Sequence, residues 1–184
     1  MRGASLDAMD DGAFEVSDDS SPTEAFGPDE LDIACAALFR RVARAARDDD
    51  VRRRFTGAAT ALGWFTAINQ RDWPALLVTV DPDLVVRDHR PVGIGTVTGA
   101  AAYVETIRQG VEVIPDAVWR MRDLLAFDEA GKLALELQVV GIVDGGEVEL
   151  ASVCVAGANE SGLTVTFDIY AIDQREEVLA QFGS

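Results

Sequence analysis

The sequence predicts an α+β fold in which helices come first and a curved antiparallel sheet follows. Two observations lead to this class. Up to about residue 113 the apolar residues recur mostly at helical spacing, whereas from residue 118 they recur at every second position. The period-two segments are joined by short, turn-rich links, which require antiparallel neighbours because a parallel crossover needs about a dozen residues or more. We therefore expect one strand, one helix and then a four-strand meander, packed around the N-terminal helices.

Charge is distributed unevenly along the chain. The formal net charge of the 184 residues is −16, and residues 1–30 hold nine acids but only one base, Arg2. The stretch 18–24 has no apolar periodicity and cannot bury enough surface to offset the entropy of ordering. We therefore expect residues 1–27 to be a disordered acidic tail, either a solubilising leader or a docking peptide for a basic partner.

The composition also argues against several classes of partner and location. A negative net charge repels nucleic acid and anionic membrane surfaces. No apolar run approaches the ~18 residues of a membrane span, and the N-terminus lacks the apolar segment of a secretory signal. Cys35 and Cys154 do not make a disulfide framework. We expect a cytoplasmic protein that binds neither nucleic acid nor membrane.

Residues 28–55 are expected to form an accessory N-terminal helix. The acids of Pro28-Asp29-Glu30 suit the positive end of a helix dipole. Three adjacent aspartates at 48–50 interrupt the pattern, and a second helical pattern follows over 51–69. The arginines between Arg40 and Arg54 lack interleaved aromatic residues, so we interpret them as a solvated helix face and not as a nucleic-acid site. The first apolar stripe consists of Leu31, Cys35, Leu38, Val42 and Ala45.

The remaining elements follow in order along the chain. Asp72 can cap a short helix that begins at Trp73-Pro74 and is broken by the prolyl segment 81–83. A strand over 84–90 stops at Pro91, and a glycine-rich loop leads to a helix over 100–113. A short helix over 174–182 closes the chain. The four strands of the meander are expected at Val118–Phe127, Leu133–Val143, Glu147–Ala156 and Leu163–Ile172.

The densest polar cluster within an apolar element lies at the end of the strand over 84–90. His89 is the only histidine, and its ordinary pKa lies near neutrality. Alternation places Asp88 on the same face as Arg90, with His89 on the opposite face. One hypothesis is that these residues form ion pairs at the strand end or at a dimer interface. The other is that Asp88 or Asp123 lies in an apolar cavity, where loss of water would raise its pKa and suit it to proton transfer.

Four apolar or aromatic residues are candidate walls of that cavity, although each could equally be plain core. Familiar motifs of other chemistries are missing from the sequence. The glycines over 93–99 do not have dinucleotide-binding spacing, one histidine and two distant cysteines do not make a usual metal site, and no nucleophile elbow accompanies His89. We therefore expect no cofactor and no metal. The candidate walls are Trp64, Tyr103, Trp119 and Met121.

Several segments carry a resemblance to a known family. The segments Ala67–Leu76, Val86–Pro91, Gly99–Val104 and Phe167–Tyr170 resemble the SnoaL-like branch of the nuclear-transport-factor-2-like superfamily. The resemblance implies that residues 56–184 form a cone-shaped domain whose sheet wraps around helices and leaves an internal cavity, commonly in homodimers. The subgroup that it suggests is bacterial. Such families include polyketide cyclases, ketosteroid isomerases, dehydratases and epoxide hydrolases, and also binding domains without activity.

Three functions are compatible with these residues. The first is a small-molecule-binding domain with an apolar pocket and a ligand-binding or regulatory role. The second is a cofactor-independent cyclase or isomerase in which Asp88 or Asp123 moves a proton while His89, Arg90 or Tyr103 polarises an oxygen. The third is a dimerisation or scaffold module that holds no ligand. We expect a homodimer through the outer face of the sheet and a small apolar ligand or substrate.

Overall fold

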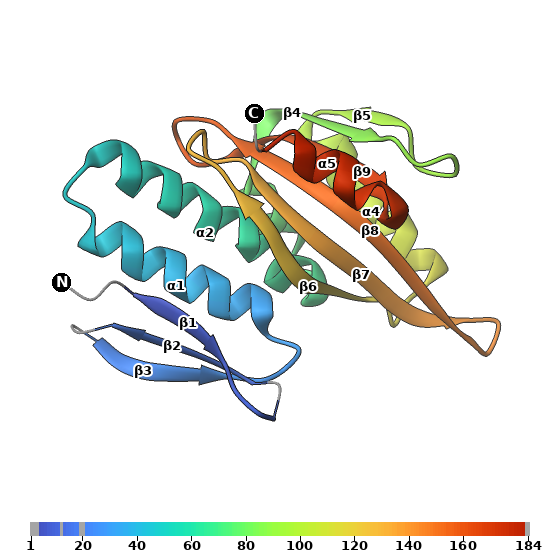
Figure 1. Cartoon of the computed structure of the whole chain (residues 1–184). Coiled ribbons are helices and arrows are strands. Elements are labelled where there is room, and N and C mark those ends of the chain that lie inside the picture. Colours follow the sequence, from blue (N-terminus) through green and yellow to red (C-terminus); the bar gives the residue numbers. More distant parts are fainter. Residues whose placement is uncertain (1–3, 12, 19–20, 183–184) are drawn as a thin grey trace.

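The computed structural model describes residues 4–11, 13–18 and 21–182. In this part of the chain a small N-terminal sheet and a larger curved sheet lie on opposite sides of a helical layer (Figure 1). The elements are β1 (Ser5–Ala8), β2 (Phe14–Asp18), β3 (Ser21–Phe26), α1 (Leu31–Ala45), α2 (Asp49–Asn69), α3 (Trp73–Leu77), β4 (Val80–Asp88), β5 (Thr96–Thr98), α4 (Ala100–Val113), β6 (Val118–Phe127), β7 (Leu133–Val143), β8 (Gly146–Ala158), β9 (Thr164–Ala171), a 3₁₀ turn (Ile172–Gln174) and α5 (Arg175–Ala180).

The larger sheet has the strand order β5-β4-β9-β8-β7-β6. The predicted α+β class and curved antiparallel sheet are confirmed. One neighbouring pair differs from the rest, because β4 and β9 run parallel, with Val86 opposite Phe167. This pairing could not be read from the short links of the meander, since it joins strands that are distant in the sequence.

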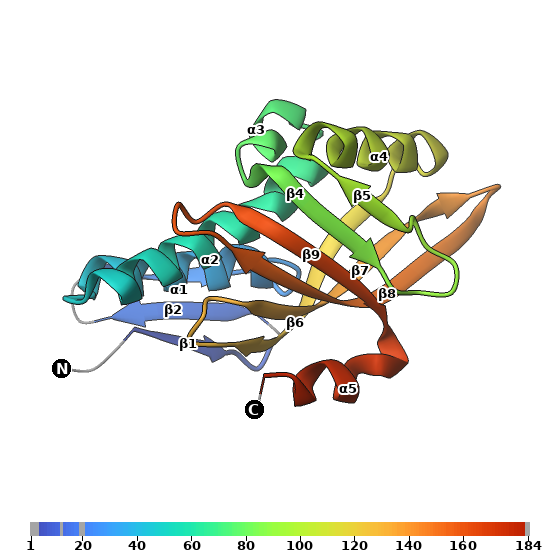
Figure 2. The same cartoon turned by 90° about the horizontal axis from the view of Figure 1, so that it is seen from above.

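The two faces of the larger sheet have different coverings. Helices α2, α3 and α4 lie on its inner side, whereas the C-terminal helix α5 lies on the outer side (Figure 2). Alternation explains the inner face: Leu84 and Val86 on β4 are fully buried, and Leu133, Leu135 and Leu137 on β7 are nearly so. The main core therefore lies between the helical layer and this face.

Most predicted elements occur where the sequence placed them. The helix over 100–113 and the strands over 118–127 and 133–143 have the predicted bounds. The first strand was placed wrongly, because β4 begins at Val80 and includes the prolyl segment, where a register shift between Val80 and Val85 absorbs the irregularity. The predicted loop also contains a short strand, β5, that pairs with β4.

The expected accessory helix is two helices. Helix α1 ends at Ala45, and the carboxylate of Asp48 caps α2 by accepting hydrogen bonds from the N–H groups of Asp50 and Val51. Helix α2 then runs without a break to Asn69. The expected boundary between residues 55 and 56 falls inside α2, so this helix is shared by the accessory and cone regions.

The expectation of a disordered N-terminal tail is wrong for the part of residues 1–27 that the structure describes. Residues 1–3, 12 and 19–20 of that segment lie outside the described residues. The others form the antiparallel sheet β1-β2-β3 on the side of α1 that faces away from α2 (Figure 1). Val16 is fully buried, and Leu6 and Phe14 pack against the core. These few apolar residues gain their burial from α1, which charge composition alone did not reveal.

A buried arginine on α1 links the small sheet to the helical layer. The Arg41 Nη2 donates 2.6 Å hydrogen bonds to Pro22 O and Glu24 Oε1, and Nη1 lies 3.5 Å from Asp18 Oδ2. Arg41 is only 4% exposed. The acids of this segment are therefore partly neutralised within the fold, because α1 supplies a matching cation.

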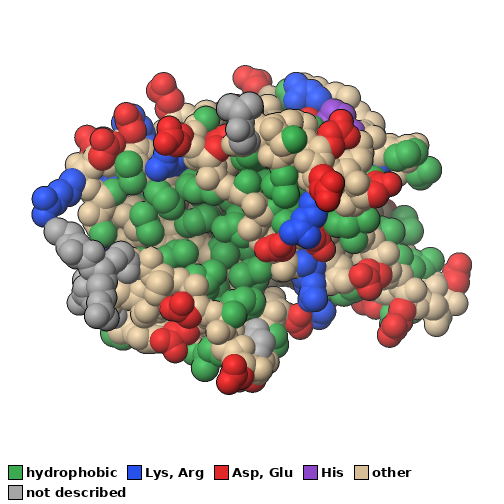
Figure 3. All heavy atoms as spheres, in the orientation of Figure 1, with side chains coloured by type: hydrophobic (Ala, Val, Ile, Leu, Met, Phe, Trp, Pro, Cys, Tyr) green, Lys and Arg blue, Asp and Glu red, His purple; other side chains and the backbone are tan. Residues whose placement is uncertain are grey.

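The surface in the orientation of Figure 1 has acidic side chains mostly around its rim and apolar side chains gathered in its middle (Figure 3). None of the helices in the described residues is long and apolar enough to cross a membrane.

Candidate functional site: a two-chamber cavity

A cavity lies between helices α2 and α4 and the inner face of the larger sheet. It consists of an outer chamber of about 190 Å³ and an inner chamber of about 30 Å³. The outer chamber is lined mainly by α4 and by the inner-face residues of β7, β8 and β9. The residues that line both chambers are Trp64, Tyr103, Leu137 and Phe167.

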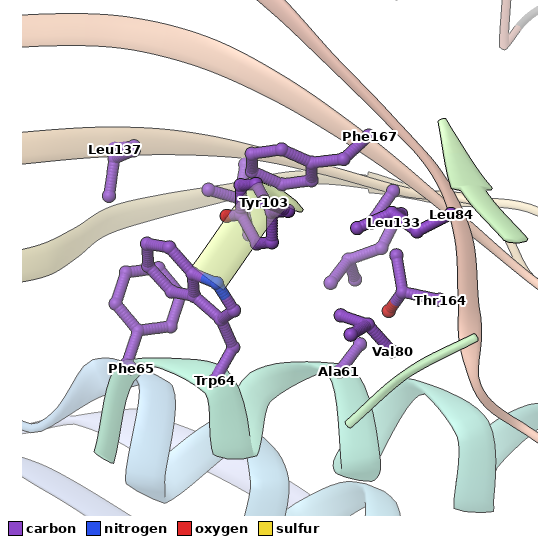
Figure 4. A pocket seen from close by; sticks show the side chains of 12 residues that line it. Ala61, Trp64, Phe65, Val80, Leu84, Tyr103, Leu133, Leu137, Thr164 and Phe167 are labelled. Carbon is purple, nitrogen blue, oxygen red and sulfur yellow. The ribbon is translucent and has the colours of Figure 1, made fainter. Parts of the chain in front are cut away.

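The inner chamber is almost wholly apolar. Figure 4 shows Ala61, Trp64 and Phe65 rising from α2, with Phe167 on the opposite side. The Trp64 ring meets Phe65 edge-on, with centroids 5.0 Å apart, and lies 6.1 Å from the Phe167 ring. Aromatic packing on both sides therefore fixes the orientation of the indole.

Two buried polar atoms belong to this aromatic group. The Trp64 Nε1 has no hydrogen-bond partner among the described residues. Tyr103 is 2% exposed, and burial raises the pKa of its hydroxyl above the ordinary value of 10, at which a tyrosine is already protonated at neutral pH. The Trp64 N–H lies near enough to that hydroxyl to lower its pKa slightly, but the two do not make a hydrogen bond of normal geometry.

Arg90 is the only charged side chain that lines either chamber among the described residues. Its Nε and Nη2 donate to Asp88 at 2.9 and 2.7 Å. The hydrogen bond to Asp88 raises the pKa of Arg90 above its already high value, so the guanidinium remains a cation. Within the described residues Nη1 has no hydrogen-bond partner, which leaves it available to a molecule in the outer chamber.

Asp88 lies on the inner side of the strand, as alternation predicted, but it does not line the chambers. Its side chain is fully buried beside Arg90 and also accepts a 2.9 Å hydrogen bond from the N–H of Ile94. Burial acts to raise the pKa of Asp88, but the hydrogen bonds from Arg90 and Ile94 outweigh it, and the pKa is lowered. The expectation of a raised pKa suited to proton transfer is therefore wrong for this residue.

A glycine makes this arrangement possible. The chain after Arg90 folds back over Asp88, and a Cβ on Gly93 would lie 2.3 Å from the Asp88 Cγ. Because only glycine lacks that atom, the loop can approach closely enough for Ile94 to reach the carboxylate.

His89 faces away from the cavity. Its ring stacks on Tyr170, with centroids 4.5 Å apart, and its Nε2 lies 2.9 Å from Asp168 Oδ1. Arg87 lies 3.6 Å from the same oxygen. The polar cluster predicted at the strand end therefore divides between two faces, and His89 lies beside Asp168 and Arg87 on the outer face.

Asp123 was expected beside Trp119 and Met121, and this expectation is wrong. A register shift between Met121 and Asp123 turns the strand, so that Asp123 pairs with Glu136. Arg175 of α5 lies 2.8 Å from Asp123 and 3.6 Å from Glu136. Asp123 therefore forms an ion pair that joins α5 to the sheet, and it lines neither chamber.

The four residues predicted as cavity walls do not all lie in the lining. Trp64, Tyr103 and Trp119 line the outer chamber, whereas Met121 is buried in the core and lines neither chamber. Trp119 is held in place by Asn69, whose side chain accepts from the Trp119 N–H at 2.9 Å and donates to its carbonyl at 2.8 Å.

Sequence reasoning missed several wall residues that come from the last strands. Ser152 lies on the inner face of β8, and Phe167 and Ile169 lie on that of β9. Alternation along β9 places Phe167 and Ile169 on one face, and the parallel pairing of β9 with β4 brings that face to Arg90. No group of three or more His, Cys, Asp or Glu side chains within the described ranges is arranged to hold a metal ion.

Comparison with known proteins adds a family and a fold. A family model described as a SnoaL-like domain matches residues 61–166, which include α4 and most of the cavity. The Gly93 loop and Arg90 lie within that match, whereas the small N-terminal sheet and α1 lie before it. No curated protein matches the chain.

Solved structures share the architecture at low sequence identity. A protein with a cystatin-like fold from Methylobium petroleophilum PM1 has a TM-score of 0.57 at 18% identity, covering 65% of this chain and 77% of that one. A proposed polyketide cyclase from Xanthomonas campestris pv. campestris has a TM-score of 0.53 at 20% identity, covering 71% and 98%. Rv0760c from Mycobacterium tuberculosis, in complex with estradiol-17β-hemisuccinate, has a TM-score of 0.52 at 16% identity, covering 66% and 95%. These likenesses show a shared cystatin-like fold.

Proposed function

The chain belongs to the SnoaL-like domain family, and from this premise we propose that it binds a small, mainly apolar molecule carrying a carboxylate in the outer chamber, without chemical turnover. The supporting observation is the charge of the lining. Arg90 is the one ionised group there among the described residues, while Asp88, Asp123 and His89 all lie outside it. A cation whose paired carboxylate does not line the chamber favours recognition of an anion over proton abstraction.

The size of the outer chamber limits the ligand. Its volume is about 190 Å³, and an apolar cavity of roughly 150 Å³ is known to hold benzene. A molecule of one or two small rings therefore fits without opening the fold. Its apolar body would contact Trp119, Ile107 and Val139, and its carboxylate would accept a hydrogen bond from the free Nη1 of Arg90.

A structural neighbour supports this class of ligand. Rv0760c has been crystallised with estradiol-17β-hemisuccinate, an apolar ring system that carries a carboxylate. That ligand is larger than the outer chamber of this chain as it stands. The proposal uses only one feature of that ligand, which is the combination of an apolar body with one anionic group.

Three ligands built on one ring system test the proposal. Calorimetric titration gives the affinities for indane and for indane-2-carboxylate, and their ratio measures the contribution of the anionic group. Only the carboxylate can accept a hydrogen bond from Arg90. We expect the carboxylate to bind roughly tenfold more tightly or better, the usual range for a charge-assisted hydrogen bond. The double variant Asp88→Asn/Arg90→Gln removes both members of the ion pair, so that no buried charge is left unpaired. It should lose the preference while binding indane unchanged, and an unchanged preference would refute the role of Arg90.

Turnover is the second candidate, and the protonated Tyr103 hydroxyl favours it, since such a donor can polarise a carbonyl oxygen. The third ligand, indan-1-one, separates binding from proton transfer. An enzyme of the isomerase or cyclase type should accelerate deuterium incorporation next to the carbonyl in D₂O, followed by proton NMR. Our proposal expects the same exchange rate with protein as in buffer, because the described lining residues include no base.

A further inference from the structure

The Trp64 N–H is a buried donor whose partner is missing from the described part of the fold. Trp64 is 8% exposed, and its Nε1 makes no hydrogen bond there. Leaving such a group unpaired costs free energy, so an orphaned donor in a cavity wall indicates a partner that the protein itself does not supply.

The indole cannot escape this position by turning. Phe65 meets its ring at an interplanar angle of 86°, and Phe167 lies against it at 31°. Both neighbours are apolar and line the inner chamber with it (Figure 4). The N–H is therefore held at the boundary of the two chambers.

A second donor lies beside it. The Tyr103 hydroxyl lies near the Trp64 N–H. It is protonated at neutral pH, as a tyrosine hydroxyl with its ordinary pKa of 10 already is, and burial raises that pKa further. Neither Trp64 nor Tyr103 takes part in the ion pair between Asp88 and Arg90, and both residues line the two chambers. Two neutral donors that lie near each other in the shared lining suit a single oxygen that carries partial negative charge.

Other polar side chains of the outer chamber already have partners. The Thr106 hydroxyl donates to Ala102 O at 2.9 Å, and the Ser152 hydroxyl lies 3.7 Å from the Cys154 Sγ. Arg90 is engaged by Asp88 through Nε and Nη2. Trp64 and Tyr103 thus form the uncommitted neutral donor pair of the lining.

We infer that Trp64 Nε1–H and the Tyr103 hydroxyl together bind one carbonyl oxygen of the ligand. This inference rests on the proposed function and narrows its ligand to a cyclic ketone or keto acid, with the carbonyl at the chamber boundary and any carboxylate at Arg90. The carbonyl oxygen offers two lone pairs, which matches two convergent donors.

The test compares indan-1-one with indane, which differ by that oxygen. In spectra of ¹⁵N-labelled protein the Trp64 indole N–H resonance, identified with Trp64→Phe, should move downfield on adding indan-1-one and stay in place with indane. The ketone should bind roughly tenfold more tightly than indane. Trp64→Phe and Tyr103→Phe should each reduce that preference several-fold. The matched control is Trp73→Phe, because Trp73 lines neither chamber, and it should leave the preference unchanged.

Each outcome has a defined meaning. The inference is overturned if the ketone and the hydrocarbon bind with equal affinity, or if the indole resonance does not move. An ordered water that accepts hydrogen bonds from both donors would give that result. If indane-2-carboxylate still binds through Arg90, the proposed function survives that failure. If none of the three ligands binds, both fail. Should Trp64→Phe not fold, the affinities of the wild-type protein and of Tyr103→Phe for indan-1-one and indane still decide the matter.

Discussion

Asp88 and Arg90 form a two-point ion pair in which Oδ1 accepts from Nε at 2.9 Å and Oδ2 accepts from Nη2 at 2.7 Å. The carboxylate is fully buried, and the guanidinium side chain is 26% exposed. Arg90 lines the outer chamber, whereas Asp88 does not. The charge of the site is thus set by two residues of which only one reaches the ligand.

Replacing Asp88 tests the structural value of this pair. Asp88→Asn should lower the free energy of unfolding by about 3 kcal/mol at pH 7, because it leaves the Arg90 cation without its partner. The pKa of Asp88 is lowered below its ordinary value of 3.8 in the folded state. Its contribution is therefore complete above that pH and is lost as the pH falls through the folded value. Urea unfolding of both proteins at pH 7 and pH 3 should show the difference shrinking, and a constant difference would contradict this account.

Gly93→Ala should displace the loop that completes the pair. The new Cβ would lie 2.3 Å from the Asp88 carboxyl, which hydrogen bonds hold in place and which cannot yield. We expect a loss of about 1–3 kcal/mol in stability and weaker binding of indane-2-carboxylate. Gly110→Ala is the control for stability only, because Gly110 lines the outer chamber. Open space surrounds that glycine of α4, and alanine stabilises a helix by up to about 1 kcal/mol relative to glycine. Thermal unfolding should move in opposite directions for the two variants.

Asp32 should make the protein less stable at neutral pH. Burial, opposed in part by backbone hydrogen bonds, raises its pKa from 3.8 to about 6. The folded state therefore holds a proton that the unfolded state releases, and stability falls as the pH rises between these values. Asp32→Asn should add roughly 2–3 kcal/mol at pH 7.5 and little near pH 4. Equal gains at the two pH values in urea unfolding would show that the cause is not titration of this carboxyl.

Arg41 should hold the small N-terminal sheet on α1. Arg41→Ala leaves the carboxylates of Asp18 and Glu24 without their shared cation, and it removes the donor to Pro22 O. We expect faster hydrogen exchange over β1–β3 with little change in β6–β9, because the larger sheet has its own core. Arg44→Ala, an exposed site on the same helix, is the control and should leave both regions protected. Uniform deprotection by mass spectrometry would mean that the two sheets unfold as one unit.

The sequence predicted most of the fold because its patterns are local. Period-two alternation located the meander and correctly assigned Asp88, the last residue of β4, and His89, which follows it, to opposite sides. What it could not show depends on partners elsewhere. The bulge that moves Asp123 outward becomes visible only against β7, and the small sheet depends on its contacts with α1. The sequence identifies the aromatic wall residues by their apolar character. That the Trp64 N–H lacks a hydrogen-bond partner among the described residues can be seen only from the side chains around it.

The parallel pairing of β4 with β9 has a kinetic consequence. Val86 and Phe167 are far apart in the sequence, so their pairing closes a long loop. Closing that loop lowers the conformational entropy of the chain before the contacts between the two strands can stabilise it. The helical hairpin and the meander form from near neighbours, so this pairing is expected late in folding. The outer chamber is complete only then, because Arg90 follows β4 and Phe167 belongs to β9. A molecule bound there would act mainly by slowing unfolding and would leave the folding rate almost unchanged.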